Sequence, residues 1–176
     1  GDALTGFGLS PQWSVGNGLV GLISGMVWLF ADKKKSINVV LLISAVLAAA
    51  VTVYYFLNPT TANAMFYDVN NNIFGDAQIS MFAGVSVLIG LAIVLIVRFV
   101  FGKNIDVAAA VTFSMLGNLL GIGFAAVSDI WINGYPPAVA LVGEFLPSAG
   151  PNLIFAAVLV PILVAAYAAV QKQTGR

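Results

Sequence analysis

Long apolar runs, separated by shorter polar segments, make up most of the chain after residue 13. The last run, 152–170, has no charged residue and leads into the polar tail 171–176. A bilayer with a hydrocarbon core about 30 Å thick is crossed by a helix of about 20 apolar residues. The pattern therefore predicts five membrane-spanning helices, at 14–30, 37–57, 79–101, 107–132 and 152–170.

The polar segments predict the connections between these helices. Residues 31–36 contain three consecutive lysines and predict a short charged turn, and residues 102–106 predict a second tight turn. The segment 58–78 is rich in Asn and has no base, which predicts a long loop. The segment 133–151 is rich in Gly and Pro and predicts another loop.

The composition agrees with a membrane protein, because 60% of the residues are hydrophobic and 8% are charged. A soluble domain carries roughly a quarter charged residues. We therefore expect an all-α, polytopic helical bundle that forms a single membrane domain over residues 1–176. The formal net charge is +0, so no basic surface is available for a nucleic-acid partner.

The residue types exclude several kinds of chemistry. The chain has no Cys and no His, which removes disulfides, thiolate and Ser-His-Asp catalysis and the common zinc sites. No P-loop is present, so this chain is not an ATPase. The ionisable residues inside the predicted spans are Arg98 and Asp129, both near span ends. We expect no enzyme activity, no cofactor and no metal site.

Small residues within the runs indicate where helices approach one another. Gly21 and Gly25 are four residues apart in the first run. This spacing either marks a helix-packing face or reflects the abundance of Gly in membrane helices. The last run combines several alanines with larger aliphatic residues, and Pro161 interrupts its backbone hydrogen bonds.

The basic residues predict the orientation in the membrane. Five alternating spans place all seven Lys and Arg residues on one side, which the positive-inside rule assigns to the cytoplasm. The C-terminus is then cytoplasmic, and the two long loops and residues 1–12 face outward. Because an odd number of spans starts outside, we expect a sixth helix that precedes residue 1 or was removed as a signal segment.

Two stretches carry a family resemblance. The last stretch has PS ahead of the helix and Asn152 at its start, and it ends with VPILVAAYAAV and QKQTGR. It resembles the final helix of substrate-binding S components of energy-coupling-factor (ECF) vitamin transporters. The opening, GDALTGFGLSPQWSVGNGLVGLISGMV, looks like the family's first outer loop and second helix. Five spans would match helices two to six of six. The family's first helix, whose AxxxA surface docks on the coupling subunit, is not in this sequence.

The resemblance implies a function without chemistry in this subunit. S components capture a vitamin-like micronutrient under their outer loops and topple in the bilayer when docked on a coupling subunit driven by two cytoplasmic ATPases. Aromatic residues would stack on the ligand while amides and carboxylates orient it. The candidate substrate-binding residues are Trp13, Asn17, Tyr67, Asn71, Asn72, Phe82, Asn118, Asp129 and Glu144.

Each candidate also has a structural interpretation. Trp13 suits an interface anchor, Asn118 a hydrogen bond between helices, and the Asn residues at 70–72 a plain turn. The outward segments carry acids and no base, which favours a neutral or cationic ligand. The alternative function is a structural or accessory membrane subunit that binds no soluble ligand. A third is a membrane sensor, but the short polar tail lacks an output linker.

Overall fold

The computed structural model describes residues 10–58, 67–68, 73–74 and 79–175. Two short strands, β1 (Tyr67–Asp68) and β2 (Ile73–Phe74), pair in antiparallel fashion. All other regular structure in these residues is helical. The helices are α2 (Pro11–Gly25), the 3₁₀-helix η1 (Met26–Leu29), α3 (Lys33–Leu57), α4 (Met81–Val100), α5 (Ile105–Ile132), the π-helix η3 (Val139–Phe145) and α6 (Leu146–Thr174).

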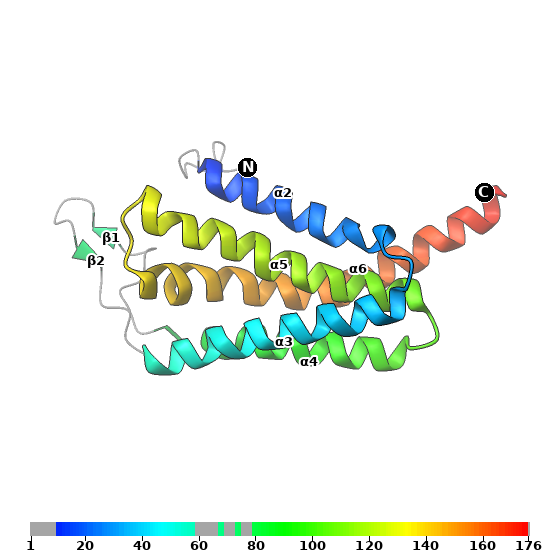
Figure 1. Ribbon diagram of the computed structural model, residues 1–176, viewed down its shortest axis with the longest axis horizontal. Helices are drawn as coiled ribbons and strands as arrows, with labels where there is room; N and C mark the ends of the chain where they lie inside the picture. Colours follow the sequence, from blue (N-terminus) through cyan, green and yellow to red (C-terminus); the bar gives the residue numbers. More distant parts are fainter. Residues whose placement is uncertain (1–9, 59–66, 69–72, 75–78, 176) are drawn as a thin grey trace.

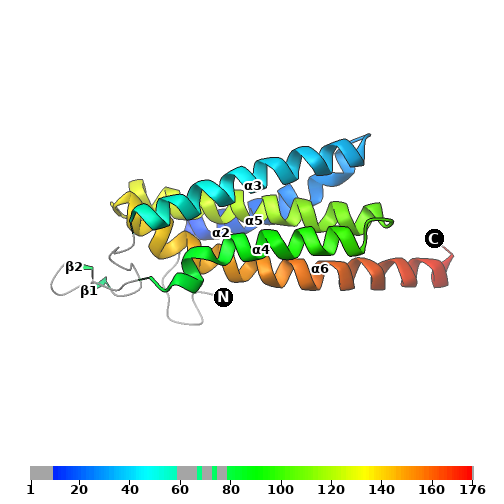
Figure 2. The same cartoon turned by 90° about the horizontal axis from the view of Figure 1, so that it is seen from below.

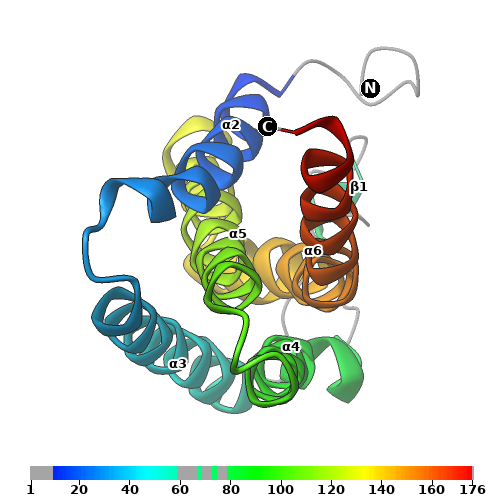
Figure 3. The same ribbon diagram turned by 90° about the vertical axis from the view of Figure 1, so that its right-hand side faces the viewer.

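The helix α5 is the centre of the bundle (Figures 1 and 3). It packs against α2, α3, α4 and α6, and 72% of its most apolar stretch is buried. The corresponding stretches of the outer helices α3 and α4 are each 28% buried. The outer helices therefore turn most of their apolar side chains outward, as helices surrounded by lipid do.

Four helices of the described chain are long and apolar enough to cross a membrane. They are α3, α4, α5 and the continuous helical run Val139–Thr174 formed by η3 and α6. Their outward side chains include large apolar groups such as Leu42, Ile96 and Leu163. The prediction of a helical membrane bundle is confirmed at this level.

The predicted first span, 14–30, is not one helix. The helix α2 ends at Gly25 after 15 residues and passes into η1, so it is not among the four candidate spans. Four glycines in this stretch lower its helix propensity. The described residues therefore contain four long apolar helices and not the predicted five.

The predicted loop at 133–151 is also mostly helical. A short turn follows α5, in which Gly134 adopts a positive φ of 69°. The chain then enters η3 and continues into α6, so Pro147 and Pro151 lie inside a continuous helical run. Helices in membrane bundles tolerate proline when neighbouring groups satisfy the freed carbonyls.

Two smaller boundaries differ from prediction because of helix caps. Lys33 begins α3, since the Asp32 carboxylate accepts a hydrogen bond from the backbone N–H of Lys35 at 2.9 Å. Residues 33–36 therefore belong to the helix and not to a turn. At the other end of the chain α6 continues to Thr174, and Gly175 caps it with a φ of 67°. Most of the predicted tail is helical.

Glycines bring α2 very close to α5. A Cβ atom on Gly16 would lie 2.6 Å from the Gly121 carbonyl oxygen, and one on Gly117 would lie 2.7 Å from the Val20 carbonyl oxygen. By contrast, a Cβ on Gly21 would meet no described atom within 4 Å. The contact between α2 and α5 therefore uses Gly16 with a glycine pair on α5, and the predicted Gly21/Gly25 pair faces outward.

Candidate functional site

Charged residues separate to the two ends of the bundle. We call the end where α3 and α5 begin and α4 ends the basic end, and the opposite end, where α2 begins and α5 ends, the acidic end (Figure 1). Asp129 and Glu144 lie at the acidic end. The basic end and the last turn of α6 carry Lys33, Lys34, Lys35, Arg98, Lys103 and Lys172. Arg176 lies outside the described residues.

Asp129 is the hub of a polar cluster at the acidic end. Its side chain lies in the last turn of α5 and its residue is only 1% exposed. One carboxylate oxygen accepts hydrogen bonds from Gln12 Nε2 at 2.6 Å and Asn133 Nδ2 at 2.5 Å. The other accepts from Trp13 Nε1 at 2.8 Å. We call Gln12, Trp13, Asp129 and Asn133 the Asp129 cluster.

The local sequence explains how the donors reach Asp129. Pro11 at the first position of α2 is pre-shaped for a helix start. Gln12 and Trp13 therefore lie in the first turn of α2, where the helix dipole is positive and favours a nearby anion. On α5, the backbone N–H groups of Asn133 and Tyr135 both bond the Asp129 carbonyl, which fixes the end of the helix.

This arrangement holds a buried carboxylate without a cation. In the part of the chain that the structure describes, the one salt bridge joins Lys33 and Asp106 at the basic end. Burying an ionised carboxylate costs several kcal/mol unless hydrogen bonds and dipoles compensate. Three neutral donors and a helix N-terminus do so here. Such costly groups inside membrane bundles usually mark functional sites.

Glu144 extends the cluster from η3. Its carboxyl group interacts with that of Asp129, and its Oε2 atom is buried with no hydrogen-bond partner in the described structure. Short π-helical segments within longer helices occur frequently at functional sites. The acidic end thus contains two neighbouring carboxyl groups, and one Glu144 oxygen is buried without a hydrogen-bond partner among the described residues.

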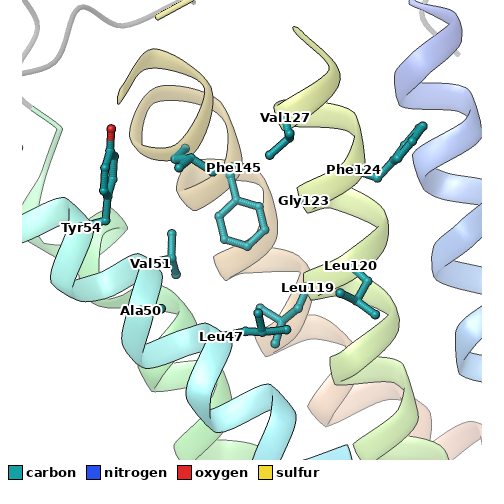
Figure 4. Close-up of a pocket in the computed structure, with 11 residues that line it drawn as sticks. Leu47, Ala50, Val51, Tyr54, Leu119, Leu120, Gly123, Phe124, Val127 and Phe145 are labelled. Atoms are coloured by element: carbon teal, nitrogen blue, oxygen red, sulfur yellow. The ribbon is translucent and has the colours of Figure 1, made fainter. Parts of the chain in front are cut away.

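An apolar pocket lies in the same half of the bundle as the Asp129 cluster, although the two share no residue. It has a volume of about 520 Å³ and is bounded by α3, α5 and η3. Figure 4 shows the Phe145 ring projecting from η3 between the two helices, with Tyr54 of α3 and Val127 of α5 on either side of it in the upper part of the view. Glu144 and Phe145 are consecutive, so η3 connects the pocket to the cluster. The volume is within the range of small-molecule pockets.

The structure brings three of the predicted site residues together, namely Trp13, Asp129 and Glu144. Asn17 is exposed on α2, and Phe82 is 62% exposed at the start of α4.

Asn118 is buried near the middle of α5. Its side chain donates a hydrogen bond to the Ser114 carbonyl of the same helix at 2.9 Å, and not to another helix of the described residues. Tyr67 is part of β1, and its side chain is not described; Asn71 and Asn72 lie outside the described residues.

Gln12 and Asn133 belong to the cluster but were not among the predicted site residues. Asn133 follows Asp129 by four residues, a spacing that places two side chains on one helix face and could have indicated the contact. Gln12 precedes Trp13 in a turn that looked only polar. No sequence signal indicated the apolar pocket, because its aromatic lining resembles any membrane helix surface.

No family model, curated protein or solved structure matches this chain.

Proposed function

We propose that the protein is a multi-pass subunit of the cell membrane that captures a small, vitamin-like micronutrient from outside the cell. The observation that carries this proposal is the buried Asp129 carboxylate, held by neutral donors beside Glu144 and an apolar pocket. The resemblance to ECF S components supports the same function. The subunit performs no chemistry of its own and delivers its ligand through partners.

In this proposal the acidic end faces outward and the basic end faces the cytoplasm. The segregation of the basic residues supports this orientation through the positive-inside rule. The helix α2 with η1 forms a fifth crossing. Fifteen α-helical residues rise about 22 Å, so α2 covers most of a core about 30 Å thick and η1 follows it.

The charge at the acidic end favours a neutral or cationic ligand. No Lys or Arg lies there among the described residues, so a buried anionic ligand would have no cationic partner. A ligand amine or N–H group would instead satisfy the free oxygen of Glu144. An aromatic ring of the same ligand would lie along η3 against Phe145 and the apolar pocket.

The proposed partners are a transmembrane coupling subunit and cytoplasmic ATPases. The C-terminal part of α6 extends past the ends of α4 and α5 (Figures 1 and 2), and no residue of α6 after Pro161 is buried. Its exposed alanines, including Ala165 and Ala169, would allow another helix to approach closely.

A second candidate is an accessory membrane subunit with no soluble ligand. The observation that favours it is the outward face of α2. A Cβ atom added to Gly18, Gly21 or Gly25 on this face would meet no described atom within 4 Å. In this alternative the glycines would pack against a helix of another protein, and the Asp129 cluster would only lock α2 to α5.

Ligand binding separates the two candidates. We would titrate the purified protein by calorimetry with riboflavin as a neutral heterocycle, thiamine as a cation and a dicarboxylate as an anion. Binding of a neutral or cationic compound that is lost in Asp129→Asn and retained in Asp106→Asn supports capture at the acidic end. Asp106 is the matched control because it is an acid at the basic end. Tight binding of the dicarboxylate contradicts the charge argument.

A further inference from the structure

A second pocket, at the basic end, combines cationic and apolar walls. It has a volume of about 260 Å³ and lies between the first turns of α3 and α5 and the last turn of α4. Lys34, Asn38 and Arg98 supply its polar side chains. Its apolar wall includes Ile37, which is 1% exposed, and Ala108, which is 3% exposed. We call it the basic pocket.

The two cations of the basic pocket are not neutralised by acids. The neighbouring Lys33 is paired with Asp106 at 2.7 Å and lies 4.4 Å from the centre of the Trp28 ring. Within the described residues neither Lys34 nor Arg98 forms a salt bridge. Arg98 donates a hydrogen bond to the Asn38 side-chain oxygen, which orients its guanidinium group across the α3–α4 contact. The pocket therefore has an unmatched positive charge.

Helix ends add to this positive field. Both α3 and α5 begin at the basic pocket, and the N-terminus of a helix carries positive partial charge, although Asp32 and Asn104 each already accept one of the first N–H groups. The nearby acids are already engaged, because Asp32 caps α3 and Asp106 is paired with Lys33. The local charge is therefore complementary to an anion.

The surroundings of the pocket are those of a membrane boundary. Phe99 and Val100 follow Arg98 on α4 and are 87% and 65% exposed. These outward apolar side chains lie where α4 meets lipid, at the depth where long cationic side chains reach head groups. Basic pockets between transmembrane helices are known to suit anionic lipid head groups.

We propose that the basic pocket binds the phosphate group of an anionic phospholipid. The Arg98 guanidinium provides a planar fork that matches phosphate oxygens, Lys34 provides a second charge, and the acyl chains of the lipid lie along the exposed face of α4. The lipid would hold α3, α4 and α5 together at this end. This inference requires a membrane location and is independent of ligand capture at the acidic end.

Native mass spectrometry of the purified protein tests the proposal. We would measure the bound fraction of phosphatidylglycerol, which is anionic, and of phosphatidylcholine, which is zwitterionic. Lys34→Gln and Arg98→Gln are each expected to reduce phosphatidylglycerol binding about fivefold, since one cation near a membrane surface contributes about that factor. Phosphatidylcholine has the same phosphate beside a choline cation, so its binding should be weaker than that of phosphatidylglycerol and should change less. Lys172→Gln in the last turn of α6 is the matched control and should retain phosphatidylglycerol.

Lys34→Gln keeps the test valid if Arg98→Gln does not fold, because Lys34 is exposed and Arg98 links α4 to α3. Equal losses in Lys34→Gln and Lys172→Gln would show general surface attraction and overturn the proposal. Inorganic phosphate and glycerol phosphate distinguish the source of the anion. If either displaces phosphatidylglycerol at millimolar concentration, the site is one for soluble phosphate and the lipid proposal is wrong.

Discussion

Trp13 and Asn17 lie one turn apart on α2, but only Trp13 donates a hydrogen bond to the Asp129 carboxylate. Trp13 and Asp129 were predicted from their residue types and their positions near span ends. Asn17, one turn after Trp13, was predicted equally but is exposed. The face of α2 that meets α5 contains Gln12 and Gly16, so the long Trp13 side chain reaches Asp129 from the flank and the short Asn17 side chain does not.

The indole N–H of Trp13 should be a measurable part of this site. Trp13→Phe keeps an aromatic ring but removes a donor to a buried carboxylate, which should cost about 1.5–3 kcal/mol of unfolding free energy. Unfolding in mixed micelles measures this loss. Trp131→Phe is the control, because Trp131 is 75% exposed at the same end and should change stability by less than about 0.5 kcal/mol. Equal losses would mean that the bond contributes nothing.

Removal of a buried side-chain hydroxyl group from α3 should increase stability, in contrast to the loss of the Trp13 N–H. The side-chain oxygens of Ser44 and Thr52 are buried and have no hydrogen-bond partner in the described structure. Thr52→Val removes an unsatisfied group with little change of shape and should stabilise the protein by about 1 kcal/mol. Thr112→Val should instead destabilise it by a similar amount, because Thr112 donates to the Ala108 carbonyl at 2.7 Å. The prediction fails if both variants lose stability.

Among the elements, α2 was the least predictable from sequence. Its glycine spacing indicated a packing helix, but several glycine pairs were available and the sequence did not select the face. Packing selects Gly16 because it lies opposite Gly121 on α5, while Gly117 of α5 lies opposite Val20 and Ser24. The hydropathy pattern predicted a single span at 14–30 for α2 and η1, because a run of apolar residues does not distinguish α-helical from 3₁₀ geometry.

Alanine substitutions should change stability in opposite directions on the two faces of α2. Gly16→Ala places a methyl group 2.6 Å from the Gly121 carbonyl oxygen and should destabilise the protein by about 1–3 kcal/mol. Gly18→Ala enters open space and should stabilise it by about 0.5–1 kcal/mol, since Ala favours a helix over Gly. Thermal unfolding in detergent measures both. A stable Gly16→Ala variant would show that the helices do not pack so closely.

The connection between α5 and α6 was predicted wrongly for a physical reason. Prolines and glycines within 133–151 are typical of a loop, and the sequence gives little indication that a π-helix precedes Pro147. The consequence is functional, because η3 carries Glu144 to Asp129 and Phe145 into the apolar pocket. Long apolar helices such as α3, α4 and α5 were predicted well because length and hydropathy are sufficient to predict them.

For the whole molecule, the separation of charge to opposite ends predicts one orientation. Single cysteines at Asn63, Lys34 and Gln173 should differ in reactivity toward a membrane-impermeant thiol reagent in intact cells. Only the cysteine at position 63, between α3 and α4, should react, because the proposed orientation places the other two on the cytoplasmic side. Reaction at position 34 without reaction at position 63 would invert the proposed orientation.

The central claim is that the acidic end captures a small molecule, and the most direct measurement is the analysis of what the protein carries. Compounds extracted from purified wild type, Asp129→Ala and Asp106→Ala would be compared by mass spectrometry after expression in the same cells. We expect one neutral or cationic compound to be enriched with wild type and Asp106→Ala and absent from Asp129→Ala. Equal recovery of the same compounds from all three folded proteins would contradict the claim.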